Sequence, residues 1–84
     1  MGILLSMRIV LLKKQPVDLY KLIKFEGLAS CGGEAKALIS EGLVRLNGKV
    51  ETRKRKKIID GDSLQVVDTK LKVKLDPALQ RDKH

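Results

Sequence analysis

Apolar residues recur along this chain at two spacings, and each spacing predicts a different secondary structure. Near the N-terminus, the run Arg8-Ile9-Val10-Leu11-Leu12 is short, apolar and β-branched, which predicts a strand. Pro16 marks its boundary because proline cannot donate a hydrogen bond to a β-ladder. Residues 1–16 are therefore expected to hold an N-terminal strand and its connection.

A first helical stripe follows this boundary. Leu19, Leu22 and Ile23 have the i, i+3, i+4 spacing of a helix face that packs on a core. Asp18 is a favourable N-cap before them, and the pattern predicts a helix over about residues 19–26. Two helical turns are unstable alone, so this helix requires tertiary packing.

A second stripe repeats the same spacing at Ala35, Leu38 and Ile39. It predicts a helix that opens at Gly32-Gly33 and ends at Gly42. Together with the first helix it forms a pair of the helix–turn–helix kind.

The second half of the chain predicts short strands. Asn47-Gly48 lies between two alternating runs, the strongest short-range signal of a β-hairpin. Asp60-Gly61-Asp62 predicts another turn, followed by strands over residues 63–67 and 70–75. In the last strand, lysines alternate with apolar residues and share one face.

This order of elements predicts an α+β domain: an N-terminal strand, two short packed helices, then a small antiparallel or mixed sheet. Residues 17–67 are expected to form its core, residues 68–75 a C-terminal strand and residues 76–84 a polar, frayed tail.

The composition favours a small binding module over a multidomain enzyme. The chain has 84 residues and a formal net charge of +8, which predicts an anionic partner. Cys31 is the single cysteine, so no internal disulfide forms and a cytoplasmic location is expected. The two aromatic residues, Tyr20 and Phe25, are too few for a platform on which single-stranded bases stack.

The charge is concentrated in the segment Lys49–Lys57, which carries six basic residues and one acid. Arg53–Lys57 is an unbroken run of five cations, and such a run repels itself unless an anion offsets it. Contact with phosphates is favoured over two alternatives, a solvated loop and a nuclear-targeting signal.

The start of the second helix is a further candidate anion site. Gly32-Gly33 leaves backbone N–H groups open at the positive end of a helix dipole, and Lys36 lies one turn on. The simpler alternative is a permissive turn.

Signals for catalysis, metal binding and cofactor binding are missing from the sequence. His84 is the only histidine and is the last residue, which disfavours a histidine-based triad. No zinc-ligand spacing, phosphate-binding lysine motif or dinucleotide fingerprint occurs. We therefore expect no enzyme activity, small-molecule substrate, cofactor, metal or transmembrane segment.

Residues 17–67 carry a more specific pattern. Its elements are Asp18-Leu19, Leu22-Ile23, Gly27-Leu28-Ala29-Ser30, Glu34-Ala35, Leu38-Ile39, Gly42, Val44, Leu46-Asn47-Gly48-Lys49-Val50 and Gly61-Asp62. This pattern resembles the ribosomal S-four RNA-binding domain, also called the αL RNA-binding motif. Gly32-Gly33, Ala35-Lys36 and the segment 51–57 look like the small, stand-alone, ribosome-associated branch of that family.

The resemblance implies RNA contacts at the start of the second helix and in the loop and strands after it. Carried over to this chain, and with Lys57 added from the basic run, the expected contacts are Ser30, Gly32, Gly33, Lys36, Arg45, Asn47, Lys49, Arg53, Lys54, Arg55, Lys56 and Lys57. Many family members have Ser-Arg where this chain has Cys31-Gly32. A usual phosphate-binding arginine is thus absent, and the cations of Arg53–Lys57 are expected to bind phosphate in its place.

The expected function is binding of structured RNA, ribosomal RNA first, in association with ribosomes or their assembly. One alternative is a module that binds tRNA or a stalled ribosome. Others are a basic module on DNA, or on an anionic membrane or protein surface. DNA is disfavoured because Lys36 is the only cation on the second helix.

Overall fold

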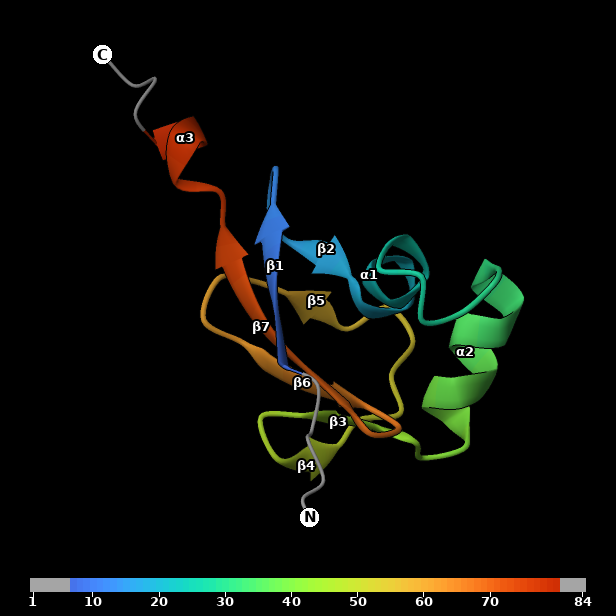
Figure 1. Cartoon of the computed structure of the whole chain (residues 1–84). Helices are drawn as coiled ribbons and strands as arrows, with labels where there is room; N and C mark the ends of the chain where they lie inside the picture. Colours follow the sequence, from blue (N-terminus) through green and yellow to red (C-terminus); the bar gives the residue numbers. More distant parts are fainter. Residues whose placement is uncertain (1–6, 81–84) are drawn as a thin grey trace.

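The computed structural model describes residues 7–80 and shows an α+β fold with a mixed sheet (Figure 1). The elements are β1 (Met7–Leu12), β2 (Val17–Asp18), α1 (Leu19–Phe25), α2 (Gly32–Ser40), β3 (Val44–Leu46), β4 (Lys49–Val50), β5 (Lys57–Ile58), β6 (Ser63–Val66), β7 (Thr69–Leu75) and α3 (Pro77–Gln80). This architecture confirms the fold class that the sequence predicts.

The main sheet has five strands in the order β1-β7-β6-β3-β4. Strand β1 runs parallel to β7, and the other three pairings are antiparallel. Helices α1 and α2 lie on one side of this sheet (Figure 1). A second ribbon pairs β2 with β5, which joins the start of α1 to the segment that follows the basic residues.

The two helical stripes bury their apolar side chains against the strands. Leu19, Leu22 and Ile23 of α1 are buried, as are Ala35 and Ile39 of α2. They pack with inward-facing strand residues, among them Val44, Ile58, Leu71 and Val73. Leu38, expected to face the core fully, is only partly buried at its margin.

The helix starts differ in detail from the predicted caps. Asp18 is the N-cap residue of α1 but makes no capping hydrogen bond with its side chain. Cys31 is the N-cap residue of α2, and the Glu34 carboxylate accepts hydrogen bonds from Ser30 N and Ser30 Oγ, at 2.6 and 2.8 Å. The Glu34 carboxylate is thus bonded to the residue that precedes the N-cap.

The C-terminal segment departs from the expected frayed tail. Pro77–Gln80 forms a short helix, α3, and Asp76 Oδ1 accepts a hydrogen bond of 3.0 Å from Ala78 N at its start. Residues 81–84, like residues 1–6 of the expected N-terminal region, lie outside the described residues. Across residues 7–80, no helix is long and apolar enough to span a membrane.

Candidate nucleic-acid interface

The segment Arg53–Lys57, called the basic loop below, contains five cations. Backbone hydrogen bonds connect it to the start of α1. Leu19 N donates to Lys56 O at 2.9 Å, and Tyr20 N donates to Lys54 O at 3.0 Å. The first N–H groups of a helix have no partner within the helix, so the loop carbonyls satisfy two of them. The basic loop and α1 therefore form one ordered unit.

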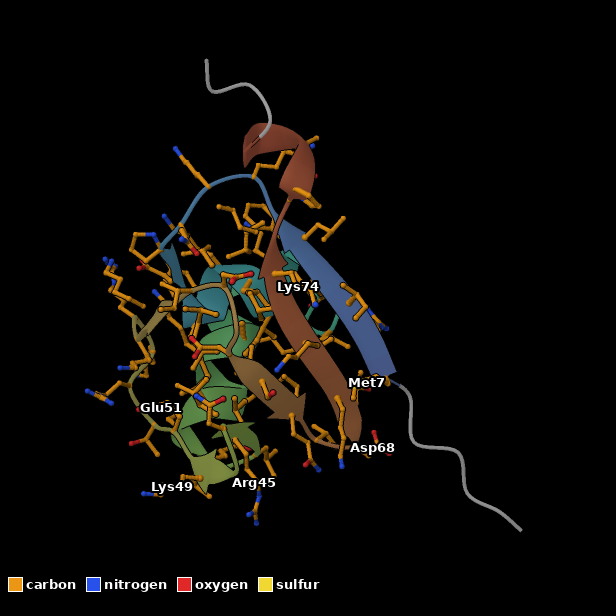
Figure 2. The ribbon with its side chains drawn as sticks, turned by 90° about the vertical axis from the view of Figure 1, so that its left-hand side faces the viewer. Met7, Arg45, Lys49, Glu51, Asp68 and Lys74 are labelled. Atoms are coloured by element: carbon orange, nitrogen blue, oxygen red, sulfur yellow. The ribbon has the colours of Figure 1, made fainter. Side chains whose placement is uncertain are left out.

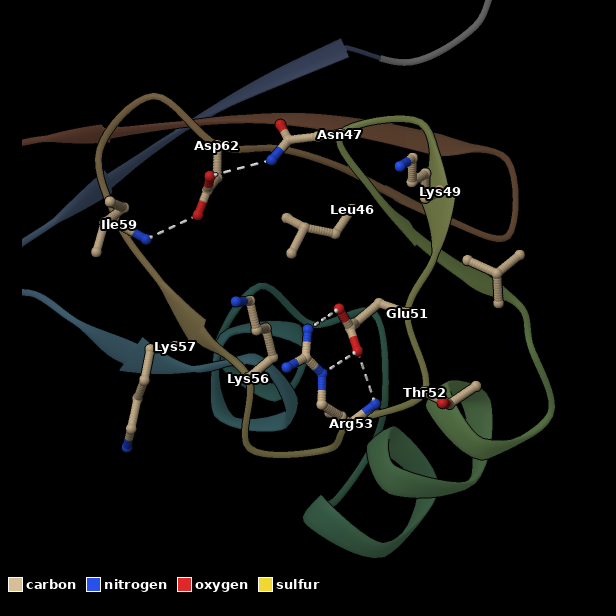
Figure 3. Close-up of a pocket in the computed structure, with 11 residues that line it drawn as sticks. Leu46, Asn47, Lys49, Glu51, Thr52, Arg53, Lys56, Lys57, Ile59 and Asp62 are labelled. Carbon is tan, nitrogen blue, oxygen red and sulfur yellow. Dashed lines mark hydrogen bonds and ion pairs between the residues drawn. The ribbon is translucent and has the colours of Figure 1, made fainter.

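Glu51 holds the start of the basic loop through hydrogen bonds to its side chain. Its buried carboxylate accepts three hydrogen bonds from Arg53, from the backbone N at 3.0 Å, Nε at 2.9 Å and Nη2 at 3.1 Å (Figure 3). These bonds to Arg53 lower the pKa of Glu51 to about 2. The same pair raises the pKa of Arg53. The guanidinium of Arg53 is thereby paired with Glu51, although the Arg53 side chain is 69% exposed.

Lys57 at the other end of the loop is also paired. Its Nζ lies 2.6 Å from Asp18 Oδ1, and this hydrogen bond lowers the pKa of Asp18. Between the two paired cations, Lys54, Arg55 and Lys56 enter none of the ion pairs formed among residues 7–80. Among the five cations of the loop, these three are thus the ones without an ion pair within residues 7–80.

Tyr20 brings the basic loop together with α2. Lys36 Nζ lies 4.6 Å from the centroid of its ring, and Arg55 Cζ lies 5.7 Å from the same centroid. Both distances are within the range of cation–π attraction. A Cβ placed on Gly32 would lie 3.7 Å from Tyr20 Cε2, so the opening of α2 is next to the ring. Sequence reasoning missed this role, and the only signal for it was the scarcity of aromatic residues.

The N-terminus of α2 is electrostatically positive. The backbone N–H groups of Glu34 and Gly33, in that order, lower the pKa of the Cys31 thiol, because their dipoles favour the thiolate. The Cys31 side chain makes no capping hydrogen bond, and Ser30 Oγ donates a hydrogen bond to the Glu34 carboxylate. Of the predicted residues at this end, Gly32 and Lys36 lie next to the Tyr20 ring, Gly33 lies next to Cys31, and the hydroxyl of Ser30 is bonded to Glu34.

An open depression of about 840 Å³ lies between the β3–β4 hairpin and the basic loop (Figure 3). Its lining includes four predicted contact residues at exposed or half-exposed positions, Lys49, Arg53, Lys56 and Lys57. The depression connects the hairpin to the loop and extends the positive surface.

Asn47 also lines this depression but has a structural task. Its backbone has φ 52°, in the left-handed region that a tight Asn-Gly hairpin requires. Its Nδ2 donates to Asp62 Oδ1 at 3.2 Å, and its Oδ1 accepts from Ser63 N at 2.9 Å. The amide thus ties the hairpin to the next turn.

Arg45 is separated from the other predicted contacts. It is exposed on β3, and its register partner on β6 is Gln65, so both side chains point to the face of the sheet opposite the helices (Figure 2). The twelve predicted residues therefore do not form one surface.

Comparison with models of protein families shows the family to which this chain belongs. The model of the S4 domain matches residues 10–74, most of the chain. The chain belongs to the S4 domain family. The resemblance found in the sequence is confirmed, and the match spans both helices, the basic loop and strands β3 to β6.

Individual proteins give further comparisons. YbcJ of Escherichia coli (strain K12), named as a candidate RNA-binding protein, is 48% identical over 54 residues, which cover 63% of this chain and 77% of YbcJ. A YbcJ protein of Shigella flexneri gives the same figures. The solution structure of E. coli YbcJ is described as revealing an αL motif involved in RNA-binding. It matches 83% of this chain and 87% of its own, with a TM-score of 0.60 and 37% identity.

Proposed function

We propose that this chain is an RNA-binding module of the cytoplasm that docks on folded RNA, ribosomal RNA first, and performs no chemistry of its own. The proposed contact surface, called the helix–loop face below, comprises Tyr20, Gly32, Gly33, Lys36, Lys54, Arg55 and Lys56. Membership of the S4 domain family and the similarity to YbcJ support binding of RNA.

The observation that carries the proposal is the position of Tyr20 between Lys36 and Arg55. Two positive features that lie far apart in the sequence meet at this ring, so the loop and the helix start present their charges together. A phosphate backbone that reaches one feature is within reach of the other. This is the arrangement expected of a protein that positions itself through phosphates.

The helix–loop face favours recognition of shape over recognition of sequence. The ring of Tyr20 is close to two cations and is not a free platform for base stacking. Double-stranded RNA offers its phosphates and 2′-hydroxyls in a regular geometry, and proteins bind it largely by that geometry. A folded ribosomal RNA element fits this face better than an unstructured strand.

Filter binding to a folded ribosomal RNA fragment across a salt series tests the proposal. The triple variant Lys54→Gln, Arg55→Gln and Lys56→Gln removes the three loop cations that form no ion pair within residues 7–80. Because each lost phosphate contact lowers the slope of log affinity against log salt by about 1, we expect a decrease of roughly 2–3. A slope equal to that of the wild type would refute the assigned face.

Lys70→Gln, Lys72→Gln and Lys74→Gln together form the matched control. This variant removes the same charge from the face of the sheet that points away from the helices. Its slope is expected to change by less than about 1, the share of a single contact. Competition with transfer RNA and with duplex DNA in the same assay identifies the class of nucleic acid, and preference for duplex DNA would overturn the proposal.

A further inference from the structure

The face of the sheet that points away from α1 and α2, called the outer sheet face below, carries two parallel stripes of unlike chemistry. The parallel pairing of β1 with β7 places each outward residue of one strand beside an outward residue of the other. The pairs are Met7 with Lys70, Ile9 with Lys72, and Leu11 with Lys74. Figure 2 views the molecule from this side, with β7 and β1 in front and the helices behind.

The apolar stripe is exposed along its whole length. Met7 is 65% exposed, Ile9 57% and Leu11 52%, whereas Val10 and Leu12, on the inward side of the same strand, are buried. A solvated sheet face ordinarily carries polar residues at its outward positions. Three consecutive outward apolar residues on one strand therefore form a contiguous stripe of the kind that marks interaction sites.

The lysine stripe beside it lacks a countercharge. Lys70, Lys72 and Lys74 take part in none of the ion pairs formed among residues 7–80, and Lys72 Nζ has only two long contacts, to Gly61 O at 3.4 Å and Ser63 Oγ at 3.5 Å. Arg45 extends the positive row across β6 to β3. The outer sheet face thus combines an apolar edge with a row of cations.

This combination distinguishes among possible occupants. A second copy of the chain would bring like charges together, which is unfavourable for a molecule of net charge +8. RNA would neutralise the lysines but would leave the aliphatic stripe in water. An amphipathic helix with acidic residues along one flank satisfies both stripes, because its apolar side covers β1 while its carboxylates meet β7.

The dimensions agree with such a helix. From Met7 to Leu11 the strand rises by about 13 Å at ~3.3 Å per residue. An α-helix covers that length in about nine residues at ~1.5 Å each. Two to three turns of helix therefore match the apolar stripe.

We propose that the outer sheet face docks an acidic amphipathic helix of a partner protein. This face is opposite the helix–loop face, so one molecule can hold RNA and a protein at the same time. The proposal is independent of RNA binding and is tested without RNA.

The test uses the ¹⁵N-labelled full chain and a designed helical peptide of roughly 14 residues, with leucines along one face and glutamates on one flank. We expect amide shifts to change along β1 and β7 and to stay unchanged at Lys54–Lys56. Lys70→Glu, Lys72→Glu and Lys74→Glu together should weaken binding at least about tenfold. Ile9→Thr, which keeps a β-branched strand residue, should weaken it about threefold.

Controls separate this proposal from general charge attraction. The variant Lys54→Gln, Arg55→Gln and Lys56→Gln should bind the peptide within about twofold of the wild type. Equal binding of a scrambled peptide, or shifts confined to the helix–loop face, would overturn the proposal. So would failure to bind the peptide together with binding of phosphatidylglycerol vesicles through the same residues, which would make the occupant a membrane.

Discussion

Glu51 shows how a single acid can organise a basic segment. It is the only acid within Lys49–Lys57, and its side chain is largely buried, at 12% exposure. Three hydrogen bonds from Arg53 compensate for that burial. Arg53 is therefore an anchor of the loop, and its exposed guanidinium is already paired with one carboxylate.

The depressed pKa of Glu51 predicts a specific dependence of stability on pH. A carboxyl whose folded pKa is about 2, against 4.5 for the ordinary group, stabilises the fold above pH ~4.5. That contribution is lost as the pH falls toward 2. Glu51→Gln should lower the free energy of unfolding at pH 7 by about 2 kcal/mol and flatten its decline between pH 4.5 and 2.

Denaturant unfolding across this pH window measures the effect. Glu41→Gln, which removes an exposed carboxylate beyond the end of α2, is the matched control and should change stability by less than about 0.5 kcal/mol. A wild-type protein and a Glu51→Gln variant with parallel pH profiles would contradict the assigned role.

Asn47 makes a second prediction for a single residue. Asn47→Ala removes two hydrogen bonds and places an alanine at positive φ, so the free energy of unfolding should fall by about 2 kcal/mol. Asn47→Gly tolerates the same φ and should lose about half as much. Thermal unfolding checks both variants, and an unchanged Tm for Asn47→Ala would be evidence against the structural role.

At the scale of elements, the basic loop and the two helix starts form a single unit. Backbone hydrogen bonds join the loop to α1. The ring of Tyr20 joins the loop to α2 through cation–π contacts with Arg55 and Lys36. The charged side chains are thus held by short elements that would be unstable separately. Their arrangement depends on tertiary contacts throughout.

Gly33→Ala separates helix stability from RNA contact. An added Cβ would lie 3.9 Å from Cys31 Sγ, an ordinary contact, and alanine favours the helix, so stability should rise by about 0.5–1 kcal/mol. The same methyl group would hinder a phosphate at the helix start and should weaken RNA binding about threefold or more. Unfolding and filter binding measure the two effects, and unchanged affinity would remove the helix start from the interface.

Local sequence signals predicted the elements well because their causes are local. The two helical stripes and the Asn47-Gly48 turn require only neighbouring residues, and they occur as predicted, except that Leu38 of the second stripe is only partly buried. The β2–β5 ribbon and the parallel β1–β7 pair were not foreseen. They join segments about 40 or more residues apart, and no pattern within either segment encodes the partner.

The candidate site, like the fold, was predictable only where neighbouring residues determine it. Sequence reasoning identified the helix start and the basic loop, but it treated all five loop cations as equivalent. The structure distinguishes Arg53 and Lys57, which are paired internally, from the three between them. It also places Arg45 on the outer sheet face. Both distinctions depend on where distant side chains meet.

At the scale of the whole molecule, the sheet separates two positive surfaces. The helix–loop face concentrates cations around Tyr20, and the outer sheet face sets lysines beside an apolar stripe. Cations that contribute to the net charge of +8 therefore lie on two surfaces with different chemistry. A small domain with two such faces is suited to linking a folded RNA to a protein.

Folded RNA is expected to bind the helix–loop face. Amide chemical-shift mapping of the full chain with a folded ribosomal RNA helix tests it most directly. We predict changes at Gly32, Gly33, Lys36 and residues 54–56, with little change along Thr69–Leu75. Changes concentrated on Thr69–Leu75, with the start of α2 and the basic loop unaffected, would contradict the account.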